Sequence, residues 1–184
     1  MSLKHAILGF LDLEPTTGYT LQQRFAGSVG SFWTATQSQI YRELHALEAD
    51  GMARVEVHPQ AGKPSRKVYA LTTAGRNELR RWLAEPVAPQ QLRDPLLLKL
   101  VFAAEAPPED IDAVLAQHER ELAARLAEYE ERLNAPEIFT LARSARERVL
   151  WMLSIENGVE WARTQLEWTK EARLRLSMRP RRKR

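Results

Sequence analysis

Five of the six side chains in the segment QSQIYR, residues 37 to 42, form hydrogen bonds readily, and they stand at the start of a predicted helix. They are Gln37, Ser38, Gln39, Tyr41 and Arg42. The sixth, Ile40, begins an apolar series with Leu44 and Leu47 at the spacing of a buried helix face. Glutamine pairs well with adenine, arginine with guanine, and hydroxyl groups with phosphates or bases. We expect this helix to enter the major groove of DNA by its first turn, although an ordinary solvated helix start explains the same residues when the helix is taken alone.

A second group of polar and basic residues follows in the segment GKPSRK and consists of Lys63, Ser65, Arg66 and Lys67. Alternating apolar residues in MARVEV, residues 52–57, and KVYAL, residues 67–71, predict two strands, so the group lies at the tip of a β-hairpin. Each cation there neutralises a DNA phosphate and releases counterions. A basic loop by itself is usually solvated surface, but one that directly follows a groove-type helix is independent support for DNA binding.

The five tryptophans raise the question of a pocket for a small aromatic effector. The candidates are Trp33, Trp151 and Trp161. Aromatic residues at helical spacing are more often part of a core or a dimer interface, so both interpretations stay open. Tyr41 has two interpretations as well, a DNA contact, which we favour, and partly buried packing.

Several classes of function lack their residues in this sequence. There is no cysteine, the four histidines have no metal-ligand spacing, and no glycine-rich phosphate loop or local catalytic signature is present. We therefore expect no metal, no cofactor and no enzymatic activity. No apolar run approaches the twenty residues that span a bilayer, which predicts a cytoplasmic protein without a membrane partner.

The elements that position the polar helix occupy the N-terminal part of the chain. Apolar spacing predicts helices over residues 3–11, 19–27 and 37–49, then the hairpin, then a helix over 73–83. This order is that of a winged helix-turn-helix, in which the helix before the hairpin enters the groove. We assign residues 1–85 to this DNA-binding domain.

Long helices without strand signals follow, beginning near Asp94, near Pro108 and near residue 139. We assign residues 92–177 to an antiparallel long-helix dimerisation domain, because helices of this length cannot cover their apolar stripes within one small domain. The residues expected at the dimer interface are Leu115, Leu122, Leu126, Tyr129, Leu153 and Trp161. The fold class is thus mainly α with a small β-hairpin.

The net charge of +3 is itself weak evidence for a nucleic-acid partner. Five positive charges lie within residues 179–184, so the rest of the chain has a net negative charge. We expect residues 178–184 to form a disordered basic tail that adds a modest, salt-screened attraction to DNA.

Three segments carry a resemblance to a known family. AILGFLDLEPTTGYTLQQRF, IYRELHALEADGM and KVYALTTAGRNELRRWL are similar to conserved blocks of the PadR-like transcriptional regulators, in particular the group with a long helical C-terminal part similar to the virulence activator AphA. Over residues 3–83 the resemblance rests on many matching residues. Beyond residue 92 it rests only on a similar arrangement of long helices. It implies a homodimeric DNA-binding regulator, usually a repressor, with C-terminal helices that form the dimer and in some members bind a small molecule. Gln39 stands where family members often have a small residue, so the resemblance does not imply the operator sequence.

The sequence therefore predicts a homodimer that binds double-stranded DNA at a pseudo-palindromic operator, most often as a repressor, and leaves a response to a small aromatic effector open. The alternative is a protein-interaction module, in which the winged domain binds a partner protein. Steep weakening of DNA binding by salt distinguishes the two. The operator, the regulated genes, the effector and the direction of regulation are not determined by the sequence.

Overall fold

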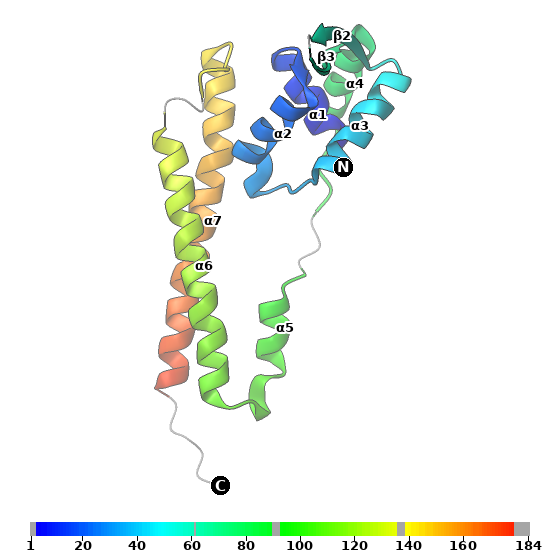
Figure 1. Ribbon diagram of the computed structural model, residues 1–184. Helices are drawn as coiled ribbons and strands as arrows, with labels where there is room; N and C mark the ends of the chain where they lie inside the picture. The colour runs from blue at the N-terminus through cyan, green and yellow to red at the C-terminus, as the bar shows by residue number, and fades with distance from the viewer. Residues whose placement is uncertain (1–2, 61, 90–92, 136–138, 179–184) are drawn as a thin grey trace. The chain divides into compact units, whose positions relative to one another are not determined.

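The computed structural model describes residues 3–60, 62–89, 93–135 and 139–178. The chain divides into two compact units, Met1–Pro89 and Gln90–Arg184 (Figure 1). Both are mainly helical, and a small antiparallel sheet lies in the first. No helix among the described residues combines the length and the apolar character needed to cross a membrane.

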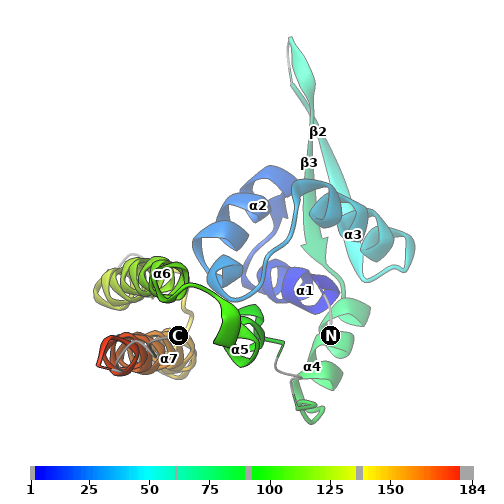
Figure 2. The same ribbon diagram turned by 90° about the horizontal axis from the view of Figure 1, so that it is seen from below.

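The first unit is a winged helix-turn-helix. Its elements are α1 (Leu3–Leu13), β1 (Thr16–Thr17), α2 (Gly18–Gly27), a short 3-10 helix (Val29–Ser31), α3 (Gln37–Ala49), β2 (Ala53–Gln60), β3 (Lys63–Leu71) and α4 (Thr73–Leu83). The strands β2 and β3 form the wing, which extends away from the helices (Figure 2).

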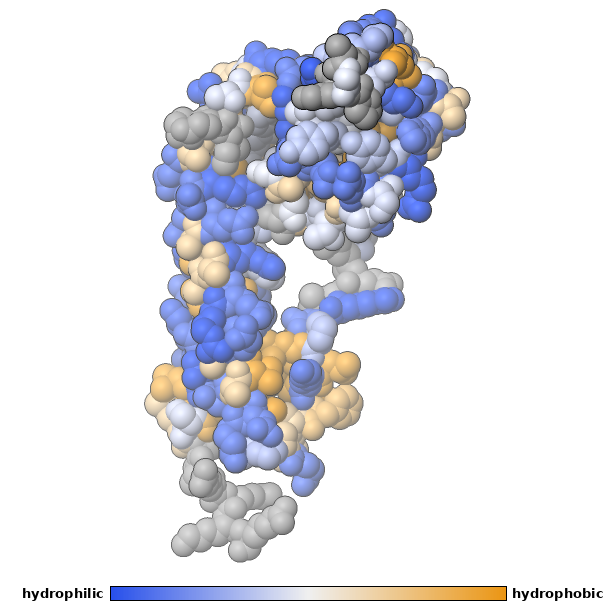
Figure 3. Space-filling model, viewed as in Figure 1, coloured by the Kyte–Doolittle hydropathy of each residue, from blue (hydrophilic) through white to orange (hydrophobic). Residues whose placement is uncertain are grey.

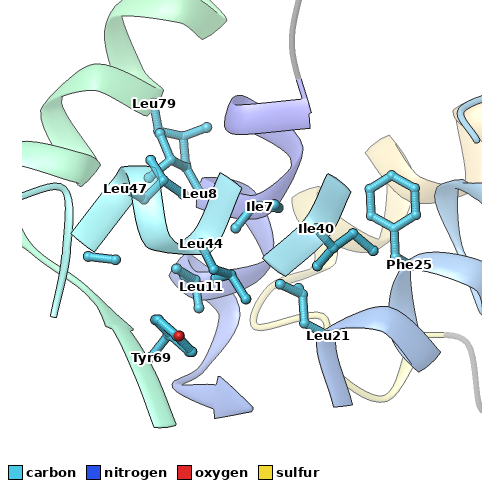
Figure 4. Packing of buried hydrophobic residues seen from close by; sticks show 11 residues of the cluster. Ile7, Leu8, Leu11, Leu21, Phe25, Ile40, Leu44, Leu47, Tyr69 and Leu79 are labelled. Atoms are coloured by element: carbon cyan, nitrogen blue, oxygen red, sulfur yellow. The ribbon is translucent and has the colours of Figure 1, made fainter. Parts of the chain in front are cut away.

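One apolar core holds the first unit together. Figure 4 shows α1, α2 and α3 contributing side chains to a common cluster, with Tyr69 of β3 and Leu79 of α4 at its edge. The most deeply buried members are Ile7, Leu8, Leu21, Ile40, Leu44, Leu47 and Tyr69. Burying a side chain of this kind contributes about 1.5–3 kcal/mol, so this core fixes which face of α3 turns outward.

The sheet differs from the predicted hairpin in two respects. A third strand, β1, pairs antiparallel with β3 through Thr16↔Tyr69 and Thr17↔Val68, giving the order β1-β3-β2. The basic segment does not form a loop, because β3 begins at Lys63 and pairs with β2 almost to the turn. Gly62 makes this close connection possible through a φ of 71°, a conformation that glycine adopts without strain.

The second unit contains α5 (Pro95–Val101), a short 3-10 helix (Ala103–Glu105), α6 (Pro108–Asn134) and α7 (Ala145–Ser177). The two long helices run antiparallel and pack along their length (Figure 1). The predicted start of the last helix near residue 139 is wrong. It begins at Ala145 because Ser144 caps it, accepting a hydrogen bond from the Glu147 N–H over 3.1 Å.

Candidate nucleic-acid interface

The first turn of α3 is exposed on its polar side and anchored on its apolar side. Gln37, Ser38, Gln39 and Arg42 are all exposed. Ile40, Leu44 and Leu47 are between 0% and 1% exposed. The apolar stripe therefore holds the helix in the core and leaves these four polar side chains available to a ligand.

The start of α3 is fixed by a reciprocal capping box. The Thr36 side chain accepts a hydrogen bond from the Gln39 N–H over 3.3 Å, and the Thr36 N–H donates to Oε1 of Gln39 over 2.8 Å. Two N–H groups that a helix start leaves without partners are thereby satisfied. The sequence interpretation of Gln39 as a base contact did not include this second role.

Tyr41 is half-buried and lies against the N-terminus of α2. A Cβ atom added to Gly18 would come within 2.7 Å of the Tyr41 ring, so the ring fits only because residue 18 has no side chain. Tyr41 therefore packs against α2, while part of its side chain stays exposed. This arrangement is the partly buried packing that the sequence left open beside a DNA contact. Tyr69 packs more fully: burial raises the pKa of its hydroxyl above 10.0, and nearby Glu48 and Tyr41 raise it further.

The outward face of α3 includes a residue that the sequence interpretation missed. Ser38, Arg42, His45 and Ala49 are spaced at four, three and four residues, which places them on one side of a helix, and all four are exposed. His45 is therefore a further candidate contact. The same periodicity that identified the buried stripe identifies this face when it is followed beyond the first turn.

The wing presents its basic residues along a strand. Ser65, Arg66 and Lys67 are exposed on β3, where Arg66 pairs with His58 and Lys67 with Val57 of β2. No ion pair joins Arg66 or Lys67 to a carboxylate within the described part of the chain, whereas Arg54 lies 3.4 Å from Glu56. The side chain of Lys63 and the tail residues 179–184 lie outside the described residues. Arg66 and Lys67 thus keep their charge for an anionic partner.

The tryptophans proposed for an effector pocket lie in both units. Trp33 packs against the core of the first unit. Trp151 and Trp161 are ten residues apart in α7, or about 15 Å along the helix axis. Trp161 is 46% exposed, and the guanidinium of Arg125 lies 5.7 Å from its ring centroid. Trp151 and Trp161 are therefore too far apart to line one small pocket.

A pocket of about 460 Å³ lies between α5 and α6. Leu96 and Val114 provide part of its apolar wall, and Lys99, Gln117, His118 and Glu121 provide its polar groups. Among the described residues, no three histidine or acidic side chains are grouped so that they could hold a metal ion.

The residues predicted for dimerisation fall into two sets. Leu115, Leu122 and Tyr129 are buried inside a single chain, and Tyr129 packs with Leu126, Leu133, Val159 and Ala162 between α6 and α7. They leave little surface for a second subunit. Leu153 and Trp161 are exposed. So are Leu98 and Val101 on α5 and Phe102 directly after it, where apolar side chains gather (Figure 3).

Comparison with known proteins agrees with this architecture. Residues 7–81 match the transcriptional regulator PadR-like family, and residues 92–177 match the family described as virulence activator alpha C-term. A probable transcriptional regulator of Mycobacterium tuberculosis is 48% identical over 89 residues, which are 48% of this chain and 47% of that protein. The negative transcriptional regulator PadR of Bacillus subtilis is 38% identical over 102 residues, 54% of this chain and 56% of that protein. The chain thus spans about half the length of these two relatives.

Solved structures match over nearly the whole chain. Bacillus subtilis PadR in complex with operator DNA superposes with a TM-score of 0.80 at 25% identity, covering 95% of this chain and 98% of that one, and the same protein has been solved with p-coumaric acid. The Vibrio cholerae virulence activator AphA superposes with a TM-score of 0.74 at 28% identity, covering 96% and 98%. These proteins are regulators of transcription and not enzymes. The chain thus combines a domain of the PadR-like family of transcriptional regulators with a C-terminal part of the AphA type.

Proposed function

We propose that the protein is a sequence-specific transcriptional repressor that binds duplex DNA through α3 and the wing. The observation that carries the proposal is the pairing of an exposed polar helix start with two basic side chains on β3 that have no carboxylate partner among the described residues. Side chains at the start of such a helix contact base edges, and cations on the wing contact phosphates. Repression is supported by the negative regulator of Bacillus subtilis to which the chain is similar.

The protein acts as a homodimer on a pseudo-palindromic operator. Support for a dimer comes from Leu98, Val101 and Phe102, which are 62%, 71% and 76% exposed in the single chain. Apolar groups in such a cluster are favourably buried against another surface. A two-fold dimer presents two copies of α3 to successive major grooves, which are about 34 Å apart.

A small aromatic carboxylic acid releases the repressor from DNA. The proposal is supported by the Bacillus subtilis relative, which was solved with p-coumaric acid. We place this ligand in the pocket between α5 and α6, where Lys99 and His118 offer donors to a carboxylate and Leu96 an apolar wall. Its carboxylate would have to lie on the side of Lys99 and His118, because the Glu121 carboxylate in the same lining repels an anion. A ligand there would bias the dimer only if it bound the released conformation more tightly.

The test is DNA binding by the full chain at a series of salt concentrations, measured by fluorescence anisotropy on a fragment selected from a random pool and on an unrelated fragment. We expect Lys67→Ala to weaken both complexes alike and to reduce the slope of log affinity against log salt by about one. Arg42→Ala should cost about 1–3 kcal/mol on the selected fragment and little on the other.

Lys170→Ala, which removes one exposed cation from α7, is the matched control and should leave both complexes unchanged. A wild-type protein that binds neither fragment would rule out DNA binding and favour the protein-interaction module. Binding without dependence on salt would rule out the phosphate contacts that we assign to the wing.

A further inference from the structure

The side-chain amide of Gln39 already makes one hydrogen bond within the protein. Its Oε1 accepts the hydrogen bond from the Thr36 N–H over 2.8 Å. Because that partner is a backbone donor, the atom that faces it must be the oxygen and not the nitrogen. The side chain is exposed, and its Nε2 has no hydrogen-bond partner among the described residues. At this position α3 therefore offers a donor to an approaching ligand.

The oxygen is not easily released. The bond to Thr36 is one half of the capping box, whose other half is the 3.3 Å hydrogen bond from the Gln39 N–H to the Thr36 hydroxyl. Rotating the amide away would leave the Thr36 N–H without its partner at the start of the helix. The cap therefore fixes the direction of the amide as well as the end of the helix.

The four bases make different demands on this amide, and cytosine presents only its N4 donor in the major groove. Pairing with adenine requires the glutamine oxygen to accept from N6 while the nitrogen donates to N7. Guanine, with O6 and N7, and thymine, with O4, present acceptors in the major groove and need only a donor. Adenine N7 can accept from Nε2, but the second bond of the pair, from N6, would have to share or displace the bond from Thr36 to the Gln39 oxygen. Guanine and thymine make no demand on that oxygen and leave the cap intact.

We propose that Gln39 is a specificity-determining residue that contacts DNA as a donor only and selects guanine or thymine over adenine at the base it faces. The inference rests on the proposed binding of DNA by α3. Gln37, two residues earlier, has no side-chain hydrogen bond among the described residues and keeps its whole amide for pairing with adenine. The two glutamines of one turn thus have different preferences.

The experiment compares wild type, Gln39→Glu and Gln37→Glu by selection of bound fragments from a random DNA pool. Glutamate at this third helical position keeps both bonds of the capping box but has no donor. Gln37→Glu is the matched control, because it makes the same charge change in the same turn outside the cap.

For wild type we expect one position in each half-site at which guanine or thymine exceeds adenine by about five-fold or more. In Gln39→Glu that position changes to cytosine, whose N4 amine donates to a carboxylate, and the thermal midpoint stays near the wild-type value. Gln37→Glu should change a different position.

Adenine enriched in wild type at the position that Gln39→Glu alters would overturn the inference. So would a Gln39→Glu selection identical to that of wild type, because the residue would then only cap the helix. In both cases a motif is still enriched, so DNA binding itself stands. Failure of wild type to enrich any motif overturns the proposed function together with this inference.

Discussion

Gly75 allows α4 to lie directly against the beginning of the wing. A Cβ atom at this position would lie 2.2 Å from the backbone oxygen of Met52 and 2.7 Å from Cδ1 of Leu71. The neighbouring Thr72 hydroxyl donates to the Gly51 carbonyl over 2.7 Å and accepts from the Gly75 N–H over 3.1 Å. The junction of α3, β2 and α4 thus depends on the absence of one methyl group.

We expect Gly75→Ala to destabilise the first unit by about 3 kcal/mol or more, because the atom that must move is backbone. Gly9→Ala in α1 is the matched control, since its Cβ would meet nothing within 4 Å. That variant should gain up to about 1 kcal/mol from helix propensity. Thermal unfolding followed by circular dichroism measures both, and equal midpoints for the two variants would contradict the proposed contact.

Glu78 joins α4 to α1 through several positively charged or hydrogen-bonding groups. Its carboxylate lies 2.9 Å from Arg81, 3.1 Å from Nε2 of His5 and 3.4 Å from Nζ of Lys4. The His5 ring also stacks on Trp82, with 4.7 Å between ring centroids. Hydrogen bonds from Arg81 and then His5 lower the pKa of Glu78 from 4.5 to about 2.

This carboxylate should make the stability of the first unit sensitive to acid. Because the folded-state pKa is below the unfolded one, the stabilisation is fully present above about pH 4.5 and is lost as the pH falls towards 2. Thermal midpoints measured from pH 6 to pH 2 should fall less steeply for Glu78→Gln than for wild type. Parallel profiles would show that Glu78 does not make this contribution.

At the scale of the elements, α6 and α7 approach closely where glycine faces an aromatic ring. A Cβ atom on Gly158 would lie 2.8 Å from Cζ of Tyr129, whose side chain is 6% exposed. The ring rests against Val159 and Ala162 as well, so it has little room to move. The crossing of the two helices is therefore set by this pair.

Gly158→Ala should destabilise the second unit by about 1–2 kcal/mol, because crowding outweighs the gain in helix propensity of about 1 kcal/mol. The Tyr129→Leu variant lacks the ring. In that background, Gly158→Ala should lower the free energy of unfolding clearly less than it does in wild type. A double-mutant cycle by chemical denaturation measures this coupling. Strictly additive effects would mean that the two residues do not determine the packing.

At the scale of the whole molecule, the apolar face of α5 is a surface that a single chain leaves exposed, with Leu98 at 62% and Val101 at 71%. Val101→Asp places a charge on this face, and we expect it to convert a dimer into monomers in sedimentation experiments. Operator binding should then weaken by about 100-fold or more, because two linked half-sites no longer bind together.

Val87→Asp is the matched control, because it makes the same substitution at a residue that is 80% exposed and lies outside the helices. It should preserve the dimer. Because Val101 is 71% exposed, its replacement should leave the fold of the single chain intact. A Val101→Asp protein that sediments as a dimer would place the interface elsewhere.

Sequence periodicity predicted the winged helix-turn-helix and the buried stripe of α3. The stripe of Ile40, Leu44 and Leu47 is a local property, because residues three and four apart share one side of any helix. The same reasoning predicted α6 and α7, except that α7 begins at Ala145 and not near residue 139. The N-cap serine at residue 144 was the available signal for that boundary.

Contacts between distant segments were decided only by the tertiary structure. Pairing of Thr16 with Tyr69 creates a third strand, and Leu115, Leu122 and Tyr129 are buried within one chain. Neither follows from spacing along the chain, because many segments share the same apolar pattern and only the packed fold selects between them. The sequence by itself determined which side chains of α3 are polar, whereas the folded cap determined which atoms of Gln39 remain available, since a hydrogen bond depends on positions in space.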